Sequence, residues 1–581
     1  MKKFSFLKIS TLVVILSLLG YSCKEDFLSV LPTGSISKAQ LTSKKGLEGV
    51  LISSYHALGG YGGLRMVHPN NWVWGSVRGG DANKGTDPGD FSTINPIQRF
   101  EYLPTLDVIE NNYRGLYEGI ARANSMLALI KDAASDVSAD DKKRLTAEAR
   151  FLRGHFYFSL KRNYNNTPYV DESVDVGTGI EKVTNTADLW PKIEADFKAA
   201  YDALPATQGQ IGRANKWAAA AYLAKVYMYE KKYGDAKALF DQIIANGVTT
   251  GGKKYALVPK FADLYKASND NNSESIFAVQ AAANTGSVAN ANADLDLNWP
   301  YNTGPDGPGN CCGFFQPSFE LANSYRTNAD GLPLLDGSYN SDANAVKSDM
   351  GVASSAAFTL DAGPLDPRLD HTIGRRGIPF LDWIKHPGFA WIRNQANGGP
   401  YSPKKYQYYK SDRGSLQDNS SWTPGYTALN ITVLRLADII LMAAEAEIEV
   451  GSLEKAREYV NLVRARASNP DGFVMDGAAP AANYKIGLYT TAWTDKAVAT
   501  KAVRFERKLE LGMEGHRFFD LVRWGTDVTE INAYLKYDGA AGRLPNTLGG
   551  ATYQAKNALL PLPQGQIDLL GSDILKQNPG Y

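Results

Sequence analysis

The sequence has few cysteines, almost no net charge and no long apolar run after its N-terminal region. Only three of its 581 residues are cysteines, too few for the disulfide framework that stabilises small secreted domains. Lys+Arg total 62 and Asp+Glu 61, a formal net charge of +1. This balance argues against a nucleic-acid-binding protein, which normally carries a basic excess. No later segment has 18 uninterrupted apolar residues, so no transmembrane helix is expected there.

Motifs of the common catalytic and metal sites are also missing. The six histidines form no HxxxH or HxH pair and the chain has no CxxC, which disfavours a transition-metal site. Neither a GxxxxGK[ST] phosphate loop nor a GxSxG elbow occurs. The stretch DANKGTDPGD (81–90) resembles half a calcium loop but lacks EF-hand spacing. We therefore expect no cofactor; a structural calcium ion in this loop is the alternative left open.

The N-terminus has the layout of an export signal. Lysines among the first eight residues precede an apolar stretch of 12 residues, Ile9 to Gly20, too short for a transmembrane helix of about 20 residues. Residues 1–22 are therefore expected to be a signal peptide that is removed. The following Cys23 resembles the lipidated cysteine of a bacterial lipoprotein, and several acyl chains there would anchor the protein to a membrane. An ordinary secretory signal followed by a chance cysteine is the alternative.

The residues after Cys23 read KED (24–26), which resembles the Lys-acidic-acidic signal of surface-exposed lipoproteins in Bacteroidota. Residues 23–40, with Pro32 and Gly34, are expected to form a lipidated tether. The other two cysteines, at positions 311 and 312, are adjacent. A vicinal disulfide would be strained, so two buried thiols are expected there.

Residues 41–250 are expected to be mostly helical. The segments 111–133 and 141–164 place apolar residues at helical spacing along one face. The segment 221–244 has the spacing of two helices joined by a short turn, with small alanines that allow close approach, and it resembles a tetratricopeptide repeat. A similar unit occurs at 436–467. The two units are over 200 residues apart, so we expect helical hairpins within one composite fold and no continuous solenoid.

The segment 251–430 differs in composition from the rest. It is rich in Gly, Pro, Asn and Asp, and its short strand candidates include SIFAVQ (275–280). Long irregular segments are usually functional or disordered, and the aromatic residues here favour ordered loops. The expected fold is therefore mainly α, a single domain over 41–581. Tetratricopeptide-like hairpins form its scaffold, 41–250 is its mostly helical N-terminal part, 251–430 its loop-rich part and 431–581 its C-terminal part.

The segment RFERKLELGMEGHR (504–517) carries three glutamates at four-residue intervals among several arginines. Paired carboxylates on one helix face can perform acid–base catalysis. Alternating Arg and Glu, however, favours a structural ion-pair network that ties helices together. The residues assigned to this network are Arg504, Glu506, Arg507, Glu510, Glu514, Arg517, Asp520 and Arg523.

Several long motifs together resemble the SusD/RagB family of outer-membrane nutrient-binding lipoproteins of Bacteroidota. The hallmark is AVRFERKLELGMEGHRFFDLVRWG (502–525), preceded by VLRLADIILMAAEAEIEVGSLEKAREYVNLVRARA (433–467). The chain ends in NALLPLPQGQIDLLGSDILKQNPGY (557–581), and GSVRGGDANKGTDPGD (75–90) also fits. The resemblance covers the whole chain after the signal.

The resemblance implies a location and a partner. Members of this family lie on the outer face of the outer membrane, anchored by lipid, and act as a lid over a SusC-like TonB-dependent β-barrel transporter. They bind a glycan or oligosaccharide, sometimes a peptide, and catalyse no reaction. The resemblance implies that the loop-rich part, here 251–430, carries the ligand-binding site. The expectations are therefore a membrane contact through the lipid at Cys23, a transporter partner and no nucleic acid. A surface glycoside hydrolase and a protein-binding adhesin are the competing hypotheses.

Two segments have the composition of a sugar site, in which a flat aromatic ring is combined with polar side chains that bond the hydroxyl groups. The first is HPNNWVWGSVRGGDANKG (68–85) and the second is NWPYNTGPDGPGNCCGFF (298–315). Burial of the aromatic rings in a core is the alternative for each. The candidate ligand-binding residues are Trp72, Trp74, Arg78, Asp81, Asn83, Trp299, Tyr301 and Phe315.

Overall fold

The computed structural model describes residues 36–60, 66–67, 69–175, 177–287, 297–419 and 425–581. Cys23, expected to carry the lipid, lies outside these residues, as does most of the expected tether. The first helix is α3 (Lys38–Leu41). Its N-cap Ser37 accepts a hydrogen bond from the backbone N–H of Gln40, and the Gln40 side chain accepts one from the Ser37 N–H. The last residues assigned to the tether are therefore a capped helical turn of the folded body.

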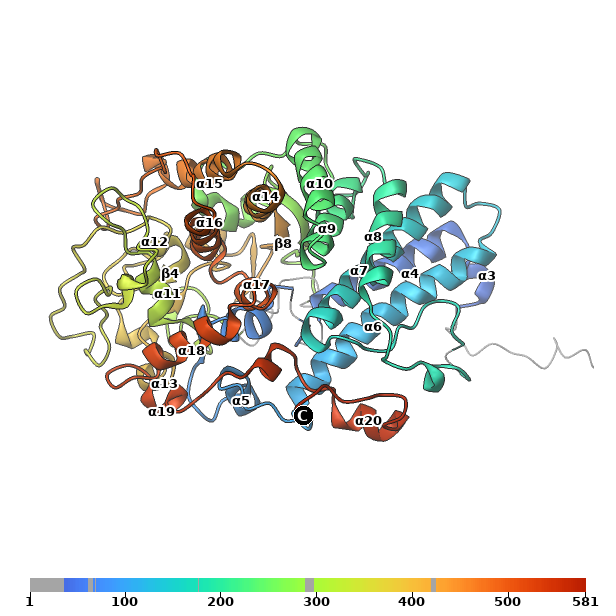
Figure 1. The fold of residues 1–581 in the computed structure, drawn as a ribbon, viewed down its shortest axis with the longest axis horizontal. Coiled ribbons are helices and arrows are strands. Elements are labelled where there is room, and N and C mark those ends of the chain that lie inside the picture. Colours follow the sequence, from blue (N-terminus) through green and yellow to red (C-terminus); the bar gives the residue numbers. More distant parts are fainter. Residues whose placement is uncertain (1–35, 61–65, 68, 176, 288–296, 420–424) are drawn as a thin grey trace, which may run out of the picture.

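The N-terminal part is a row of helices in which each packs beside the next (Figure 1). Its two longest members, α6 and α7, contain the apolar stripes that the sequence shows, and those stripes are buried. Gly119 of α6 lets the Phe156 ring of α7 come close, because a Cβ at Gly119 would lie 2.4 Å from Phe156 Cζ. The row consists of α4 (Lys44–His56), α6 (Asp107–Leu129), α7 (Ala139–Tyr164), α8 (Trp190–Ala203), α9 (Lys216–Tyr229) and α10 (Tyr233–Asn246).

Both expected helical hairpins are present. The first is α9 with α10, and the second is α14 (Leu436–Val450) with α15 (Leu453–Ala467). The alanines at the expected positions, Ala224, Ala236, Ala444 and Ala456, are all fully buried. Helix α10 packs against α14, so the two hairpins, far apart in sequence, join one scaffold. The predicted fold class, mainly α with tetratricopeptide-like hairpins, is confirmed.

The middle of the chain is irregular, with strands of at most five residues in its described part (Figure 1). The strand expected at SIFAVQ is β2 (Ser275–Val279), which pairs antiparallel with β8 (Ile431–Arg435) directly before α14. This ladder joins the loop-rich part to the helical scaffold. The other elements of this part are α11 (Phe319–Ser324), α12 (Leu369–Thr372), β4 (Ile373–Gly374), α13 (Gln395–Gly398), β5 (Ser402–Pro403), β6 (Gln417–Asp418) and β7 (Tyr426–Thr427).

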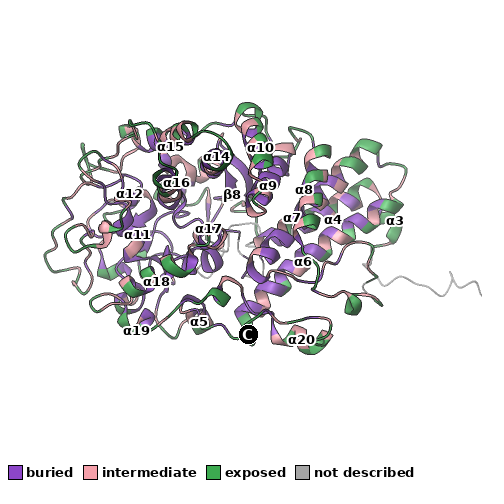
Figure 2. Ribbon diagram, viewed as in Figure 1, coloured by how far each residue is buried: buried purple, intermediate pink, exposed green. Residues whose placement is uncertain are grey.

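The C-terminal helices pack back onto the scaffold, and α14, α15 and α16 lie together above the loop-rich part in Figure 1. Purple, buried faces of the helices point inward throughout (Figure 2). None of the helices in the described part of the chain combines the length and apolarity that crossing a bilayer requires. The remaining elements are α5 (Asn95–Gln98), β9 (Met475–Asp476), β10 (Ala479–Pro480), α16 (Lys496–Leu511), α17 (Arg517–Trp524), α18 (Asp527–Asp538), α19 (Pro545–Leu548) and α20 (Gln564–Leu570).

Candidate functional site

The two segments with sugar-site composition lie side by side. Strand β1 (Ala82–Gly85) of the first pairs antiparallel with β3 (Phe314–Pro317), which begins in the second. The Trp72 ring packs edge-on against Phe314, with ring centroids 6.2 Å apart, and its centroid lies 5.7 Å from that of Phe315. Residues that are more than 200 positions apart in the chain therefore form one structural unit.

Seven of the eight candidate ligand residues are interior residues of this unit: Trp72, Trp74, Arg78, Asp81, Asn83, Trp299 and Phe315 are all buried. Trp74 Nε1 donates to the Met66 carbonyl at 2.7 Å. Asn83 Oδ1 accepts from the Tyr534 hydroxyl at 2.9 Å. Neighbouring residues enclose these seven side chains, so the structure shows no open surface on them for a ligand, and their contact with one stays a prediction. A buried core and a sugar platform use the same residue types, so composition could not separate the two.

Arg78 shows how completely the polar members are used internally. Its guanidinium donates to the Tyr102 hydroxyl, to Asn163 Oδ1 and to the Asn557 carbonyl, at 2.9, 3.1 and 3.0 Å. It also stacks on the Phe518 ring, with 3.7 Å from Cζ to the ring centroid. The Arg78 side chain therefore connects the segment before β1 to the C-terminal part of the chain, and none of its N–H groups points to solvent.

Tyr301 is the one candidate that reaches the surface. Its ring is partly exposed, and the guanidinium carbon of Arg393 lies 5.3 Å from the ring centroid. Arg393 is held in turn by two carboxylates, with its nitrogens 2.5 Å from Asp87 Oδ2 and 2.5 Å from Asp90 Oδ2. We call Tyr301, Arg393, Asp87 and Asp90 the Tyr301 platform.

The backbone beneath the Tyr301 platform is fixed. Gly313, at φ 76°, allows the close approach of its neighbours, because a Cβ there would lie 3.3 Å from Tyr301 Cβ and 3.6 Å from Arg393 Cβ. The buried Lys84 ammonium donates to the carbonyls of Asp87 and Asp90 at 3.0 and 2.7 Å. Burial lowers the pKa of Lys84 to about 8, against the opposing effect of the two nearby carboxylates. The Tyr301 ring and the charged side chains beside it are thus held in position without a ligand.

The loop after Asp81 is arranged around an arginine. The guanidinium of Arg393 bridges the carboxylates of Asp87 and Asp90, and its NH1 also donates to Thr86 Oγ1 at 3.0 Å. Among the residues that the structure describes, no three His, Cys, Asp or Glu side chains are grouped as a metal site would require. A calcium ion held by this loop would need to displace Arg393, so the carboxylates do not fit that ion as they stand.

Cys311 and Cys312, next to Gly313, are joined by a disulfide. The expectation of two thiols is therefore wrong. The peptide bond between the two cysteines is cis, and their Cα atoms lie 2.9 Å apart. Cys312 is buried, while Cys311 is partly exposed beside the platform.

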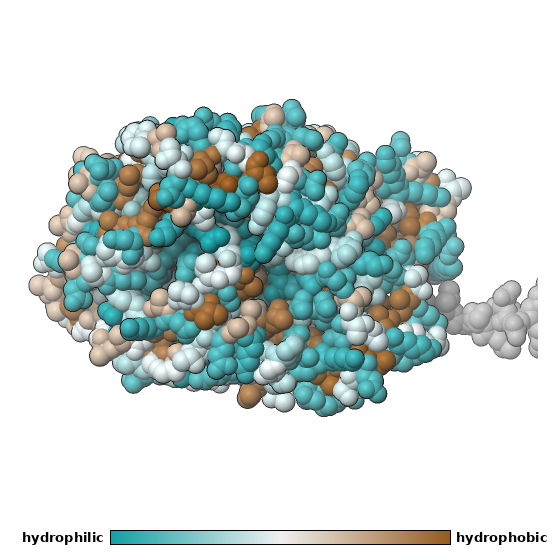
Figure 3. Space-filling view, in the orientation of Figure 1, coloured by the Kyte–Doolittle hydropathy of each residue, from teal (hydrophilic) through white to brown (hydrophobic). Residues whose placement is uncertain are grey.

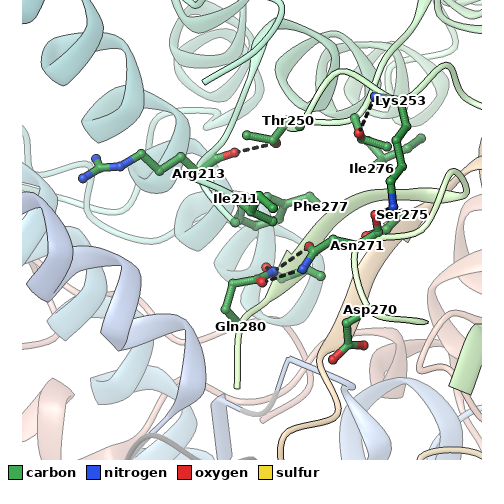
Figure 4. Close-up of a pocket in the computed structure, with 14 residues that line it drawn as sticks. Ile211, Arg213, Thr250, Lys253, Asp270, Asn271, Ser275, Ile276, Phe277 and Gln280 are labelled. Atoms are coloured by element: carbon green, nitrogen blue, oxygen red, sulfur yellow. Dashed lines mark hydrogen bonds between the residues drawn. The ribbon is translucent and has the colours of Figure 1, made fainter. Parts of the chain in front are cut away.

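A second concave site lies between the helical scaffold and β2, with a volume of about 160 Å³ (Figure 4). The side chains of Asn271 and Gln280 bond each other in both directions, at 2.9 and 3.1 Å. Asp270 accepts a hydrogen bond from the Asn430 N–H at 3.0 Å, and burial raises the pKa of its carboxyl group to about 7. Sequence reasoning missed this pocket because its polar residues come from three separate loops, none with a recognisable motif.

The RFERKLELGMEGHR segment forms a buried ion-pair network with arginines from other elements. Arg435, at the end of β8, lies 2.6 Å from Glu510, 2.8 Å from Glu514 and 2.8 Å from Glu274. Burial raises the pKa of Glu514, but Arg435 and Lys405 outweigh this effect and hold it at about 2. The three glutamates are therefore paired with cations from other elements, which suits a structural role.

The rest of the segment follows the same pattern. Arg507 lies 2.8 Å from Asp438 and 2.9 Å from Asp520, and Arg523 lies 2.9 Å from Asp520. Arg504 instead stacks on the Trp524 ring, with 4.8 Å from Cζ to the ring centroid. The remaining pairs of the predicted set are Glu506 with Arg368 and Arg464, at 2.7 and 2.8 Å, and Arg517 with Glu530, at 2.5 Å.

Comparison with known proteins identifies the family of this chain. The sequence profile of the SusD family matches residues 273–581, which include β3, the platform arginine and the ion-pair network. This chain belongs to the SusD family. A second SusD-like profile, described as starch-binding and associating with the outer membrane, matches residues 91–228.

Individual SusD relatives span nearly the whole chain. SusD-like protein P25 of Formosa agariphila is 26% identical over 497 residues, 81% of this chain and 80% of that protein. A laminarin-binding SusD-like protein has the same fold, with a TM-score of 0.62, 24% identity, and coverage of 92% of this chain and 99% of the other. Surface glycan-binding protein A of Bacteroides thetaiotaomicron, solved with laminarihexaose, superposes with a TM-score of 0.63 at 18% identity, covering 92% and 99% of the two chains.

Proposed function

We propose that this protein binds a glycan or oligosaccharide at the cell surface, with the Tyr301 platform as its contact surface. The observation that carries the proposal is the half-open Tyr301 ring braced by Arg393 in a chain of the SusD family. A sugar ring presents an apolar face that stacks on an aromatic ring and hydroxyl groups that bond charged side chains. The platform supplies both, on a fixed backbone.

The names of the relatives support the ligand class. One structural neighbour is described as laminarin-binding, another was solved with laminarihexaose, and the second matching profile is described as starch-binding. A polymeric or oligomeric carbohydrate is therefore the first class to test. A peptide ligand is the alternative within the same role, since an aromatic ring beside Arg and Asp also suits a peptide.

The protein is proposed to act by binding alone. A retaining or inverting glycosidase needs two free carboxyl groups about 5 to 10 Å apart in a cleft. The glutamates of the hallmark segment are buried and paired with arginines, and the platform carboxylates are paired with Arg393. Neither set can protonate a leaving group without first losing its partner.

Family membership also supports a transporter partner and a surface location. We propose that lipid on Cys23 anchors the protein to the outer membrane, facing outward, and that it serves as a lid over a SusC-like TonB-dependent barrel. The absence of a basic excess fits a partner other than nucleic acid. Isolation of the protein from outer membranes with a barrel of that type, under mild detergent, tests this part.

Affinity electrophoresis tests the ligand class. The protein is run through gels that contain plant, algal, host or microbial polysaccharides, laminarin and starch among them. We expect retardation by at least one polysaccharide, abolished in Tyr301→Ala and retained in Tyr201→Ala, a partly exposed tyrosine of α8. Equal retardation of wild type and Tyr301→Ala would show that the Tyr301 platform is not the glycan site. If no gel retards the protein, peptides become the ligand class to test.

A further inference from the structure

The pocket beside β2 (Figure 4) shares no residue with the Tyr301 platform. It lies between the β2–β8 ladder and two loops of the helical scaffold, one before α9 and one after α10. Its volume of about 160 Å³ is below the roughly 300–1,000 Å³ of sites for drug-sized ligands and close to the ~150 Å³ of a cavity that holds benzene. The pocket therefore has room for one small molecule or for one ring of a larger ligand.

The amide groups of the pocket hold one another in place. Asn271 and Gln280 bond each other in both directions, and Gln280 Oε1 accepts a further hydrogen bond from Asn430 Nδ2 at 3.0 Å. Asn430 Oδ1 in turn accepts from the Ala281 N–H at 2.8 Å. One polar wall of the pocket is therefore fixed without a ligand.

Asp270 has a bonding position that no described residue uses. Its Oδ2 accepts from the Asn430 N–H at 3.0 Å, whereas its Oδ1 accepts no hydrogen bond within the described chain, and the carboxyl group forms no ion pair there. Ser275, only 9% exposed, contributes a hydroxyl group that is likewise not bonded to the rest of the described structure. Both side chains line the pocket, so a ligand in it meets two unsatisfied polar groups.

The two basic residues of the pocket are engaged with other groups. The Arg213 guanidinium lies 2.7 Å from Glu48, and in Figure 4 it extends away from Asp270. The Lys253 ammonium donates to the Asn271 carbonyl at 3.3 Å. Neither basic side chain therefore serves as the counter-ion of Asp270.

The charged neighbour that acts on Asp270 is a second acid, Asp412. Burial raises the pKa of the Asp270 carboxyl group, the Asn430 N–H lowers it, and the negative charge of Asp412 raises it again, to about 7. Lys266, a basic residue near Asp412, is paired with Asp263 at 2.7 Å. An anionic ligand would add to the negative charge at this end of the pocket, whereas a cation offsets it.

We propose that this pocket binds the primary ammonium group of a small polar molecule, either an amino sugar or the free amino end of a peptide. The ammonium group donates to Asp270, and Ser275 is available to a hydroxyl or carbonyl group of the same molecule. Phe277 and Ile211, which is 61% exposed, form an apolar wall against which the carbon atoms of the molecule pack. A neutral molecule of the same size does not supply the cation that Asp270 lacks, so the site selects its ligand by charge.

Calorimetric titration of the full mature protein tests the proposal with glucosamine, glucose and alaninamide. At about pH 6.5 both amines are protonated, because an α-amino group has a pKa of about 7.7–8.0. We expect both amines to bind and glucose to bind at least about tenfold more weakly, since glucose forms no charge-assisted hydrogen bond with Asp270. Tighter binding of glucosamine would assign the ligand to amino sugars, and tighter binding of alaninamide to peptide ends. The proposal fails if glucose binds as tightly as glucosamine or if neither amine binds.

Two variants and a control locate the bound amine. Asp270→Asn keeps the shape of the side chain but loses its charge, and we expect amine affinity to fall about tenfold or more. Ile211→Trp, at an exposed position of the pocket, narrows the pocket without disturbing the core and should also weaken binding. Asp235→Asn, which changes an exposed acid of α10, should bind the amines as wild type does. Retained affinity in Asp270→Asn would overturn the proposal.

Proton release is a readout that a purely structural role of Asp270 would not produce. With a pKa of about 7, this carboxyl group is mostly protonated at about pH 6.5, so a bound ammonium group should displace most of one proton. The heat of amine binding should therefore differ between phosphate and imidazole buffers in wild type. Equal heats in the two buffers would contradict Asp270 as the partner of the amine.

The Tyr301 platform provides an independent control. Tyr301→Ala should bind glucosamine as wild type does, because the pocket and the platform have no residue in common. Loss of glucosamine binding in this variant would place the amine on the platform and overturn the proposal. None of these titrations uses a polysaccharide, so their failure leaves the proposed glycan binding to its own test.

Discussion

The guanidinium of Arg393 stacks on the ring of Tyr301, with 5.3 Å from Cζ to the ring centroid, although the two residues are 92 positions apart. Arg393 NH1 and NH2 lie 2.5 Å from Asp90 and 2.5 Å from Asp87, so the guanidinium joins the ring to the loop after β1. The face of the molecule shown in Figure 3 has its apolar residues in small separate groups.

Replacing Arg393 should weaken ligand binding without unfolding the protein. Arg393→Met keeps much of the side-chain length but loses the charge-assisted bonds to Asp87 and Asp90. We expect affinity for the retarding polysaccharide to fall about tenfold, as when about 1.4 kcal/mol of binding energy is lost. Circular dichroism melting should change little, because these pairs are partly exposed. Unchanged affinity in this variant would show that Arg393 does not contribute to ligand binding.

The buried network should dominate stability. Glu510 lies 2.6 Å from Arg435 and 3.0 Å from Arg368, and these side chains are nearly or fully enclosed. Glu510→Gln leaves the arginine charges short of a partner, and we expect a loss of about 3–5 kcal/mol in the free energy of unfolding. Glu458→Gln, which breaks an exposed pair with Lys455, is the matched control and should cost less than about 1 kcal/mol. Chemical denaturation measures both, and similar losses would contradict the assignment.

Acid should weaken the same network in a defined pH range. The pKa of Glu514 is about 2 in the folded protein, because Arg435 and Lys405 outweigh the effect of burial, against about 4.3 in an unfolded chain. Its stabilising contribution is therefore complete above about pH 4.3 and is lost as the pH falls towards 2. The difference in unfolding free energy between wild type and Glu514→Gln should be near its full value at about pH 5 to 6 and shrink between about pH 4 and 3. A constant difference down to about pH 3 would rule out this linkage.

Asp270 should lower the free energy of unfolding as the pH rises towards neutrality, whereas Glu514 lowers it as the pH falls. Burial raises the pKa of this carboxyl group to about 7, against about 3.9 in an unfolded chain. The folded state binds the proton more tightly, so the contribution of Asp270 to stability falls as the pH rises from about 4 to 7. Asp270→Asn keeps an acceptor for the Asn430 N–H and removes this fall. We expect the variant to gain stability relative to wild type between about pH 4.5 and 8, measured by chemical denaturation; no change in the difference would contradict the raised pKa.

The adjacent cysteines should resist alkylation. Because Cys311 and Cys312 are disulfide-bonded, iodoacetamide should modify neither in the denatured protein until a reductant is added, and both afterwards. Peptide mass spectrometry over the segment containing them gives the answer directly. Modification without reductant would show that Cys311 and Cys312 are two thiols, as expected from the sequence.

The sequence alone predicts the scaffold well. Apolar periodicity locates α6 and α7, and the small alanines, such as Ala224 and Ala444, mark hairpins whose helices do lie close. Alternating Arg and Glu also points to an ion-pair network, although its main cation, Arg435, stands outside the segment that suggests it. Local patterns succeed here because each helix buries a face that its own residues define.

The binding surface was much harder to predict. Trp74 and Trp299 have the chemistry of a sugar platform, but both lie inside the unit that β1 and β3 form. Arg393 carries no signal in its own neighbourhood, and its role depends on contacts with residues over 300 positions earlier. Exposure and long-range pairing are properties of the folded chain, so residue type and spacing could not reveal them.

Calorimetric titration of the retarding glycan into wild type, Tyr301→Ala and Tyr301→Phe tests the central claim most directly. Stacking on the ring predicts that the phenylalanine variant keeps its affinity within about threefold, while the alanine variant loses about tenfold or more. This result would place the sugar on the Tyr301 platform. Equal affinity for all three proteins would contradict the account and show that the glycan binds elsewhere on the molecule.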